Sequence, residues 1–94
     1  MLKTLEDLIK IIRERKSSSD GSSYPSKLLK DKSLSLEKVK EEIGELIEAV
    51  ENNSNKVHEA ADVLYHLLVY LEGNGVRIED IMNELEKRKK KKES

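Results

Sequence analysis

Two pairs of carboxylates, each with its members three residues apart, are the residues of this sequence best suited to chemistry. They are Glu42 with Glu45, and Glu59 with Asp62. A helix turns by about 100° per residue, so the members of each pair lie on one face of a helix. Carboxylate oxygens held close together bind hard divalent cations such as Mg²⁺ or Mn²⁺. A chain rich in glutamate also carries such pairs on solvated faces, so the residues by themselves leave both interpretations open.

The second pair differs from an ordinary solvated pair because the sequence after Asp62 becomes apolar and offers no nearby Lys or Arg. The two pairs lie on consecutive predicted helices joined by a short turn near residues 51–55, and short connections favour antiparallel neighbours. Glu45 lies about as far before this turn as Asp62 lies after it. We therefore expect four carboxylates to face one volume, where without a cation they would repel one another and their pKa values would rise.

The spacing of apolar residues predicts helices. Leu5, Leu8, Ile9 and Ile12 recur at the spacing of one helix face, and no segment alternates with the period of two expected for a strand. The predicted class is all-α, and Ser35 is the predicted N-cap of the third element. We expect one domain over residues 1–94: a helix ending near 16, a flexible serine-rich loop and short helix within about 17–35 (the short helix over 27–32), helices over about 35–50, 55–73 and from 78, and a basic tail over 88–94.

The fourth predicted helix is apolar on nearly all sides between Val63 and Tyr70. A helix that is apolar all round is buried all round, and a 94-residue chain has few helices with which to surround one. We therefore expect a homodimer, in which this helix packs on its own subunit with one face and on a second subunit with another. We interpret His66 as a hydrogen-bonded core histidine and His58 as a surface residue.

Composition excludes several classes of protein. Charged residues make up 39% of the chain but the net charge is only −1, which argues against a protein that coats nucleic acid or an anionic membrane. The chain has no cysteine, and neither a signal peptide nor a transmembrane segment is evident, so we expect a cytoplasmic protein. The composition of the serine-rich segment favours a flexible connector over a phosphate-facing loop, and the basic tail reads as solvated.

Three segments together resemble a known family: ERKSSSDGSSYPSKLL (14–29), KVKEEIGELIEA (38–49) and HEAADVLYHLLVYLEGNGVRIEDIMNELEKR (58–88). They are similar to the phosphoribosyl-ATP pyrophosphohydrolases of histidine biosynthesis, which belong to the MazG-type all-α nucleotide pyrophosphohydrolases. The likeness covers residues 5–88. The ExxE…ExxD pattern marks the superfamily, whereas the ADxxYHLLV run and the segment from Arg15 to Tyr24 point to this family.

The resemblance implies a MazG-like helical bundle completed by homodimerisation, and a Mg²⁺-dependent enzyme, with Mn²⁺ as an alternative. It implies hydrolysis of phosphoribosyl-ATP to phosphoribosyl-AMP and pyrophosphate, the second step of histidine biosynthesis. A functional link to the cyclohydrolase of the next step is also implied, because larger family members are fused to it. The metal ligands map onto the two acidic pairs, Glu42, Glu45, Glu59 and Asp62, with Glu41 as a further acidic residue beside them. The substrate-binding residues implied are Arg15, Lys16, Ser23, Tyr24, Lys27 and Lys38.

Two alternatives remain open at this point. One is a MazG-type pyrophosphatase that acts on ordinary NTPs or dNTPs, which would have the same metal site and a different pocket. The other is a non-catalytic helical dimer whose acidic residues are merely solvated. The number of metal ions, the general base and the pairing of dimers into tetramers are also open.

Overall fold

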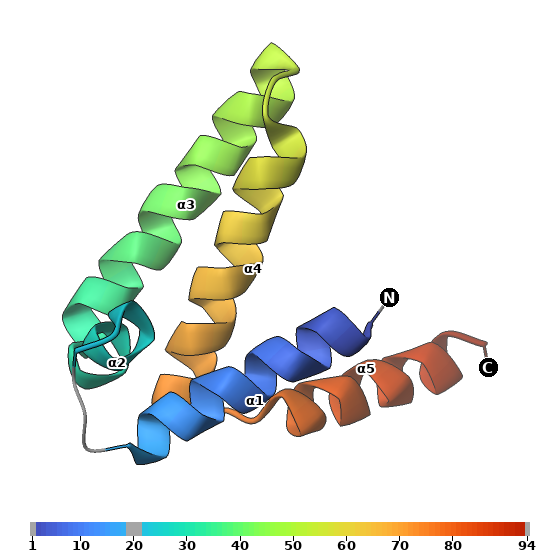
Figure 1. The fold of residues 1–94 in the computed structure, drawn as a ribbon. Helices are drawn as coiled ribbons and strands as arrows, with labels where there is room; N and C mark the ends of the chain where they lie inside the picture. The colour runs from blue at the N-terminus through green and yellow to red at the C-terminus, as the bar shows by residue number, and fades with distance from the viewer. Residues whose placement is uncertain (1, 19–21, 94) are drawn as a thin grey trace.

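A computed structural model describes residues 2–18 and 22–93 of the chain, and this part contains five α-helices and no strand. The helices are α1 (Lys3–Ser17), α2 (Tyr24–Lys30), α3 (Lys32–Asn52), α4 (Lys56–Gly73) and α5 (Ile78–Glu93). The predicted all-α class is therefore confirmed. Figure 1 shows two long helices, α3 and α4, side by side as a hairpin, with α1 and α5 running away from its base and α2 beside it.

The α3–α4 hairpin turns through three residues, 53–55. Asn53 and Asn55 both have left-handed backbone conformations, with φ of 50° and 52°. Asparagine tolerates this conformation better than most residues because its short polar side chain can hydrogen-bond locally. The Asn53 N–H also donates to carbonyls at the end of α3, which satisfies part of the helix terminus. The short antiparallel connection predicted from the sequence is therefore present.

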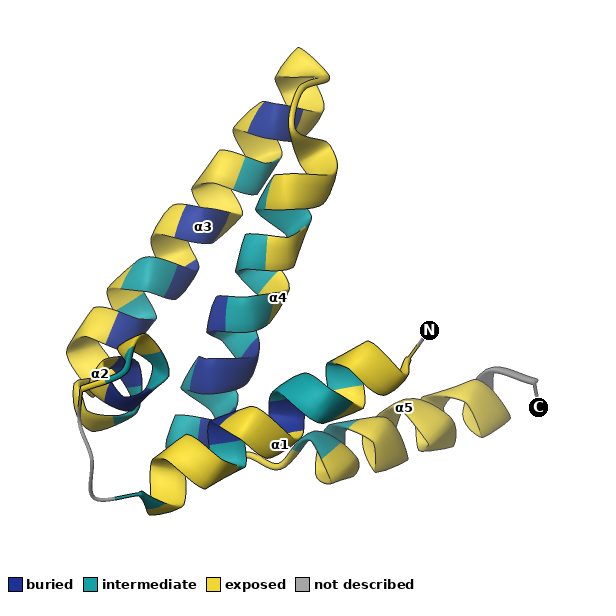
Figure 2. Ribbon diagram, viewed as in Figure 1, coloured by how far each residue is buried: buried dark blue, intermediate teal, exposed yellow. Residues whose placement is uncertain are grey.

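The hydrophobic core lies at the base of the hairpin, where α1, α2 and α4 meet. Its buried members are aliphatic, as a chain without Phe or Trp requires: Ile9, Ile12, Leu28, Leu68 and Val69. In Figure 2 the buried positions cluster at this base and along the facing sides of α3 and α4, whereas the tip of the hairpin and most of α5 are exposed. The core therefore anchors one end of the hairpin and leaves the other end projecting.

Two predicted boundaries are wrong. The helix α3 begins at Lys32, and Asp31 is its N-cap, with Oδ1 accepting the Leu34 N–H at 3.0 Å. Ser35, the predicted cap, lies buried inside the helix, because Asp31 is an equally good cap and nothing between the two residues breaks a helix. The short helix α2 begins at Tyr24 rather than at residue 27, since Ser23 caps it and Pro25 suits a first turn.

Two further expectations concern flexible segments. Of the segment over 17–35, predicted to hold a flexible loop and a short helix, residues 19–21 lie outside the described part of the chain, and most of the rest is helical in α1, α2 and α3. The expected tail over 88–94 is helical up to Glu93. Lysine and glutamate are good helix formers, and lysines near a helix C-terminus interact favourably with the negative end of the helix dipole. Both effects explain why the helix continues.

Several apolar side chains of the hairpin are exposed. Val57 is 85% exposed and Leu64 is 53% exposed, and α3 adds Ile43, Ile47 and Val50. The second subunit expected from the sequence would cover such residues, so the homodimer stays a prediction with a surface that suits it. None of the described helices is both long and apolar enough to cross a membrane.

Candidate active site

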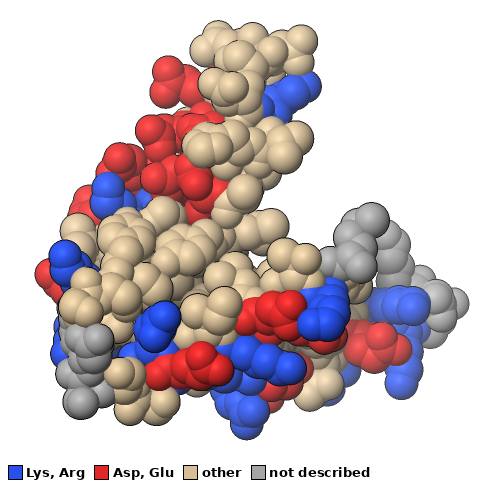
Figure 3. Space-filling model, viewed as in Figure 1, with Lys and Arg blue, Asp and Glu red and all other residues tan. Residues whose placement is uncertain are grey.

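The hairpin brings the two acidic pairs together. Glu42 and Glu45 lie on α3, Glu59 and Asp62 lie on α4, and the charges of Glu45, Asp62 and Glu59 all act on the Glu42 carboxyl. Figure 3 shows acidic side chains gathered along the α3 side of the hairpin, while basic side chains lie mostly around its base and on the other helices. Among the described residues, the candidate ligand atoms that lie within 4.8 Å of one another form two groups, one on α3 (Glu41, Glu42 and Glu45) and one on α4 (His58, Glu59 and Asp62). That all four carboxylates face one volume stays a prediction, consistent with the charges that act on Glu42 from both helices.

Glu42 is the buried member of this acidic cluster. Glu42 is only 8% exposed, and its Oε2 atom has no hydrogen-bond partner among the described residues. Burial is the main cause that raises the pKa of Glu42 to about 7, followed by the adjacent Glu45 carboxylate and the charges of Asp62 and Glu59. A buried carboxylate without a donor and surrounded by acids lacks a counter-charge. A hard divalent cation fits this site, because it would supply that charge to oxygen ligands.

The α4 half of the site contains one residue that the sequence reasoning set aside. His58 is exposed, as expected, but its Nε2 lies 3.4 Å from Asp62 Oδ2 and 3.8 Å from Glu59 Oε1. Burial raises the pKa of Glu59, the charge of Glu45 raises it further, and His58 opposes this. The spacing of four between His58 and Asp62 was the signal that could have found this contact, since such residues are neighbours on a helix.

Glu41 and Lys38 lie at the edge of the α3 half. Glu41 is exposed and can offer an oxygen within 4.8 Å of oxygens from Glu42 and Glu45. Lys38 Nζ lies 3.6 Å from Glu41 Oε2. Lys38 therefore partly neutralises the acidic residue that adjoins the cluster.

The implied substrate-binding residues fall into two groups. Arg15 and Lys27 are exposed, which leaves their side chains accessible to an anion. Lys16, Ser23 and Tyr24 already have partners within the chain. The Lys16 ammonium donates to the Glu72 carbonyl at 2.6 Å, and Ser23 Oγ caps α2 by accepting the Ser26 N–H at 3.3 Å.

Tyr24 contacts the helix that contributes half of the acidic cluster. Its hydroxyl lies 2.9 Å from His66 Nε2, while His66 Nδ1 lies 2.9 Å from the carbonyl oxygen of Asp62. His66 is buried, so the expected hydrogen-bonded core histidine is confirmed. Its connection to Tyr24, 42 residues earlier, could not be read from the sequence.

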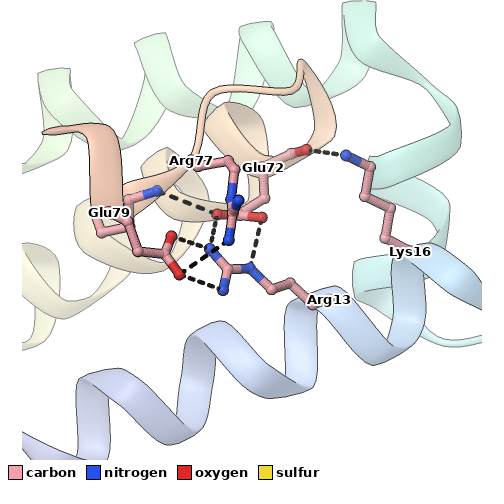
Figure 4. Close-up of polar contacts among 6 residues, drawn as sticks. Arg13, Lys16, Glu72, Arg77 and Glu79 are labelled. Carbon is pink, nitrogen blue, oxygen red and sulfur yellow. Dashed lines mark hydrogen bonds and ion pairs between the residues drawn. The ribbon is translucent and has the colours of Figure 1, made fainter.

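A further ionic cluster, which sequence reasoning missed, joins α1, α4 and α5 (Figure 4). Arg13 donates to both carboxylate oxygens of Glu72, from Nε at 3.0 Å and from Nη2 at 2.9 Å, and to Glu79 from Nη1 at 2.9 Å. Arg13 lowers the pKa of the buried Glu72 carboxyl and lowers that of Glu79 to about 2. The partners are 59 and 66 residues apart, so no local spacing announces them.

Fold and site together define an all-α protein with a carboxylate-rich helical hairpin. A sequence model of the phosphoribosyl-ATP pyrophosphohydrolase family matches residues 5–89, and the chain belongs to this family. The resemblance drawn from the motifs is therefore confirmed. No solved structure gives a significant match.

Relatives of about this chain's length and longer, bifunctional relatives both match. The chain is 46% identical to a phosphoribosyl-ATP pyrophosphatase of Methylobacterium nodulans, an alignment that covers 90% of this chain and 82% of the relative. It is 42% identical to one from Methanosarcina acetivorans, covering 96% of this chain and 91% of the relative. It is 40% identical to the histidine biosynthesis bifunctional protein HisIE of Pyrococcus furiosus, where 95% of this chain matches 43% of the relative. The chain thus corresponds in length to the shorter relatives and to less than half of the bifunctional one.

Proposed function

We propose that this protein hydrolyses phosphoribosyl-ATP to phosphoribosyl-AMP and pyrophosphate in histidine biosynthesis. The observation that supports this most directly is the meeting of the two acidic pairs around Glu42, a buried carboxylate without a hydrogen-bond donor at Oε2. Family membership and relatives named phosphoribosyl-ATP pyrophosphatase indicate the substrate.

The four carboxylates Glu42, Glu45, Glu59 and Asp62 would hold Mg²⁺, or Mn²⁺ in its place. A cation held there would supply positive charge for the phosphate oxygens and for the transition state. Arg15, Lys16 and Lys27 neutralise the remaining phosphate charge, Arg15 by paired hydrogen bonds from its guanidinium. All three residues are exposed, and Lys16 must leave the Glu72 carbonyl to bind phosphate.

The reaction adds water across the anhydride bond between the α- and β-phosphates. The water oxygen bonds to one of these two phosphorus atoms, and the bond from that phosphorus to the bridging oxygen breaks. The other phosphate group leaves with the bridging oxygen, which separates phosphoribosyl-AMP from pyrophosphate. A proton of the water passes to a carboxylate. Glu41, which adjoins Glu42 and Glu45 and pairs with Lys38, is one candidate for this base, and the four ligand carboxylates are the others. A carboxylate within hydrogen-bond reach of water is the requirement, and all five acids lie on the same hairpin.

We further propose that the chain forms a homodimer in the cytoplasm. Exposed apolar side chains along the hairpin, including Ile47 and Val57, would become buried against a second copy. A functional link to the cyclohydrolase of the next step is proposed because relatives of this chain occur as bifunctional histidine biosynthesis proteins.

The proposal is tested by pyrophosphate release from phosphoribosyl-ATP and from a dNTP panel, each with Mg²⁺ and with EDTA. We expect release from phosphoribosyl-ATP only, abolished by EDTA and by Glu59→Gln but retained in the exposed control Glu51→Gln. Release from dNTPs alone would favour the MazG-type alternative. If neither Mg²⁺ nor Mn²⁺ raises the melting temperature and Glu59→Gln changes nothing, the non-catalytic dimer is favoured.

A further inference from the structure

His66 connects the proposed substrate-binding segment at Tyr24 with the helix that contains the proposed metal ligand Asp62. It lies four residues after Asp62, one helical turn further along α4, and its ring is buried at 8% exposure. The Asp62 carbonyl oxygen, 2.9 Å from Nδ1, can only accept a hydrogen bond, so Nδ1 is the nitrogen that bears a proton. In the neutral ring Nε2 then has a lone pair and accepts from the Tyr24 hydroxyl at 2.9 Å.

Three aromatic rings contact one another around this hydrogen bond. The rings of Tyr24 and Tyr65 stack, with centroids 6.3 Å apart and an angle of 12° between their planes. His66 meets both rings edge-on, with centroids 5.8 Å from Tyr24 and 5.1 Å from Tyr65. Such arrangements are favourable for aromatic pairs. Two of the three tyrosines in the chain take part in this contact.

Hydrogen bonds between Ser23 and Ser26 form the N-terminus of α2, next to Tyr24. Ser23 Oγ accepts the Ser26 N–H at 3.3 Å, and its hydroxyl lies 2.8 Å from the hydroxyl of Ser26, which is only 1% exposed. Tyr24 is the next residue after this cap; the residue is 45% exposed, and its hydroxyl lies 2.9 Å from His66 Nε2 on α4. The serine-rich segment between α1 and α2 therefore ends at a point fixed to the helix that contains Asp62.

We propose that His66 is a positioning residue, which through Tyr24 holds the start of α2 in register with the acidic cluster. The inference rests on the proposed function and deepens it. Tyr24 then acts in substrate binding by placing Ser23 and Lys27 at a set distance from Asp62. The triphosphate must reach both the basic segment and the acidic cluster, so this distance determines how well it binds.

The test compares Tyr24→Phe, His66→Leu and His66→Gln with the control Tyr70→Phe, which makes the same change on α4 away from this hydrogen bond. A neutral hydrogen bond contributes a factor of about 5. We expect Tyr24→Phe and His66→Leu to raise KM for phosphoribosyl-ATP by about 5-fold, with kcat and Mg²⁺ affinity retained. His66→Gln should behave like the wild type, because its amide oxygen can accept from Tyr24. The double variant Tyr24→Phe/His66→Leu should have the same KM as His66→Leu, since both changes remove the same hydrogen bond.

Two readouts do not depend on turnover. Amide hydrogen exchange over residues 24–30 should be faster in Tyr24→Phe and His66→Leu than in the wild type or in Tyr70→Phe. The ¹⁵N signal of His66 Nε2 should shift in Tyr24→Phe, while Nδ1 stays protonated. If both signatures appear but no phosphoribosyl-ATP is hydrolysed, the coupling stands and the proposed substrate falls. Unchanged KM and unchanged exchange in Tyr24→Phe would overturn the inference, and this variant decides the matter if His66→Leu does not fold.

Discussion

Replacing Glu42 by Gln should stabilise the metal-free protein at alkaline pH and remove its response to Mg²⁺. Glu42 is buried among carboxylates, and burial is the main reason that its pKa is about 7. Glutamine has nearly the same shape as a protonated glutamate and carries no charge. Its amide can also donate toward the Glu45 carboxylate, as the proton of a neutral Glu42 would.

The sign of the effect follows from the direction of the pKa change. The folded chain keeps the Glu42 proton up to a pH of about 7, whereas an unfolded glutamate releases it near 4.5. Unfolding therefore releases a proton between these pH values, and wild-type stability falls as pH rises through this window. At about 1.36 kcal/mol per pH unit, the whole window corresponds to at most about 3 kcal/mol. The variant has no proton to lose, so its advantage grows by up to this amount between pH 4.5 and pH 8.

The assay is urea unfolding in EDTA at several pH values from 4.5 to 8, at one protein concentration, followed by circular dichroism. Glu51→Gln is the matched control, because it makes the same change at an exposed position on α3. When the series is repeated with Mg²⁺ in place of EDTA, the cation should stabilise the wild type and the control but not Glu42→Gln. Pyrophosphate release should be lost in Glu42→Gln alone.

The reasoning would be refuted by a constant difference in unfolding free energy between Glu42→Gln and the wild type across this pH range. That result would mean that Glu42 titrates alike in the folded and unfolded chains. A Glu42→Gln variant that Mg²⁺ stabilises as much as the wild type would instead refute the role of this carboxylate in holding the cation.

Three further predictions follow from other parts of the molecule. Asp62→Asn should abolish pyrophosphate release and the rise in melting temperature with Mg²⁺ while circular dichroism still shows full helix content; retained activity would contradict the metal site. Arg13→Met should cost about 3 kcal/mol in urea unfolding, because it leaves the buried Glu72 without a counter-charge. Adding Glu72→Gln should recover part of this loss. The control Arg88→Met removes an exposed ion pair and should change the free energy of unfolding by less than about 0.5 kcal/mol. Equal losses in Arg13→Met and Arg88→Met would refute the burial argument. Leu64→Glu should convert the proposed homodimer to a monomer in sedimentation analysis, since Leu64 is exposed on the hairpin. An unchanged sedimentation coefficient would contradict an interface at Leu64.

The sequence by itself determined the class of the fold and predicted which carboxylates would come together. Apolar spacing along each segment and the short break near residues 53–55 are local signals, and they were sufficient to predict an antiparallel helical hairpin. The spacing of three within Glu42/Glu45 and Glu59/Asp62 then placed each pair on one helix face. Both conclusions depend on helical periodicity and turn length, which neighbouring residues decide.

Local signals were less reliable at the ends of helices. Asp31 and Ser35 are both suitable N-caps, and only the packing of α3 against its neighbours buried Ser35 and left Asp31 at the terminus. Pro25 likewise read as part of a loop, although proline also suits the first turn of a helix, where it lies in α2.

The tertiary structure decided which individual side chains meet. Burial of Glu42, rather than of another member of its cluster, depends on the rotation of α3 against α4. The contact of Tyr24 with His66 and that of Arg13 with Glu72 join residues 42 and 59 positions apart. Such contacts form because separate helices pack around one core, and no periodicity along the chain encodes the distance between two atoms on different helices.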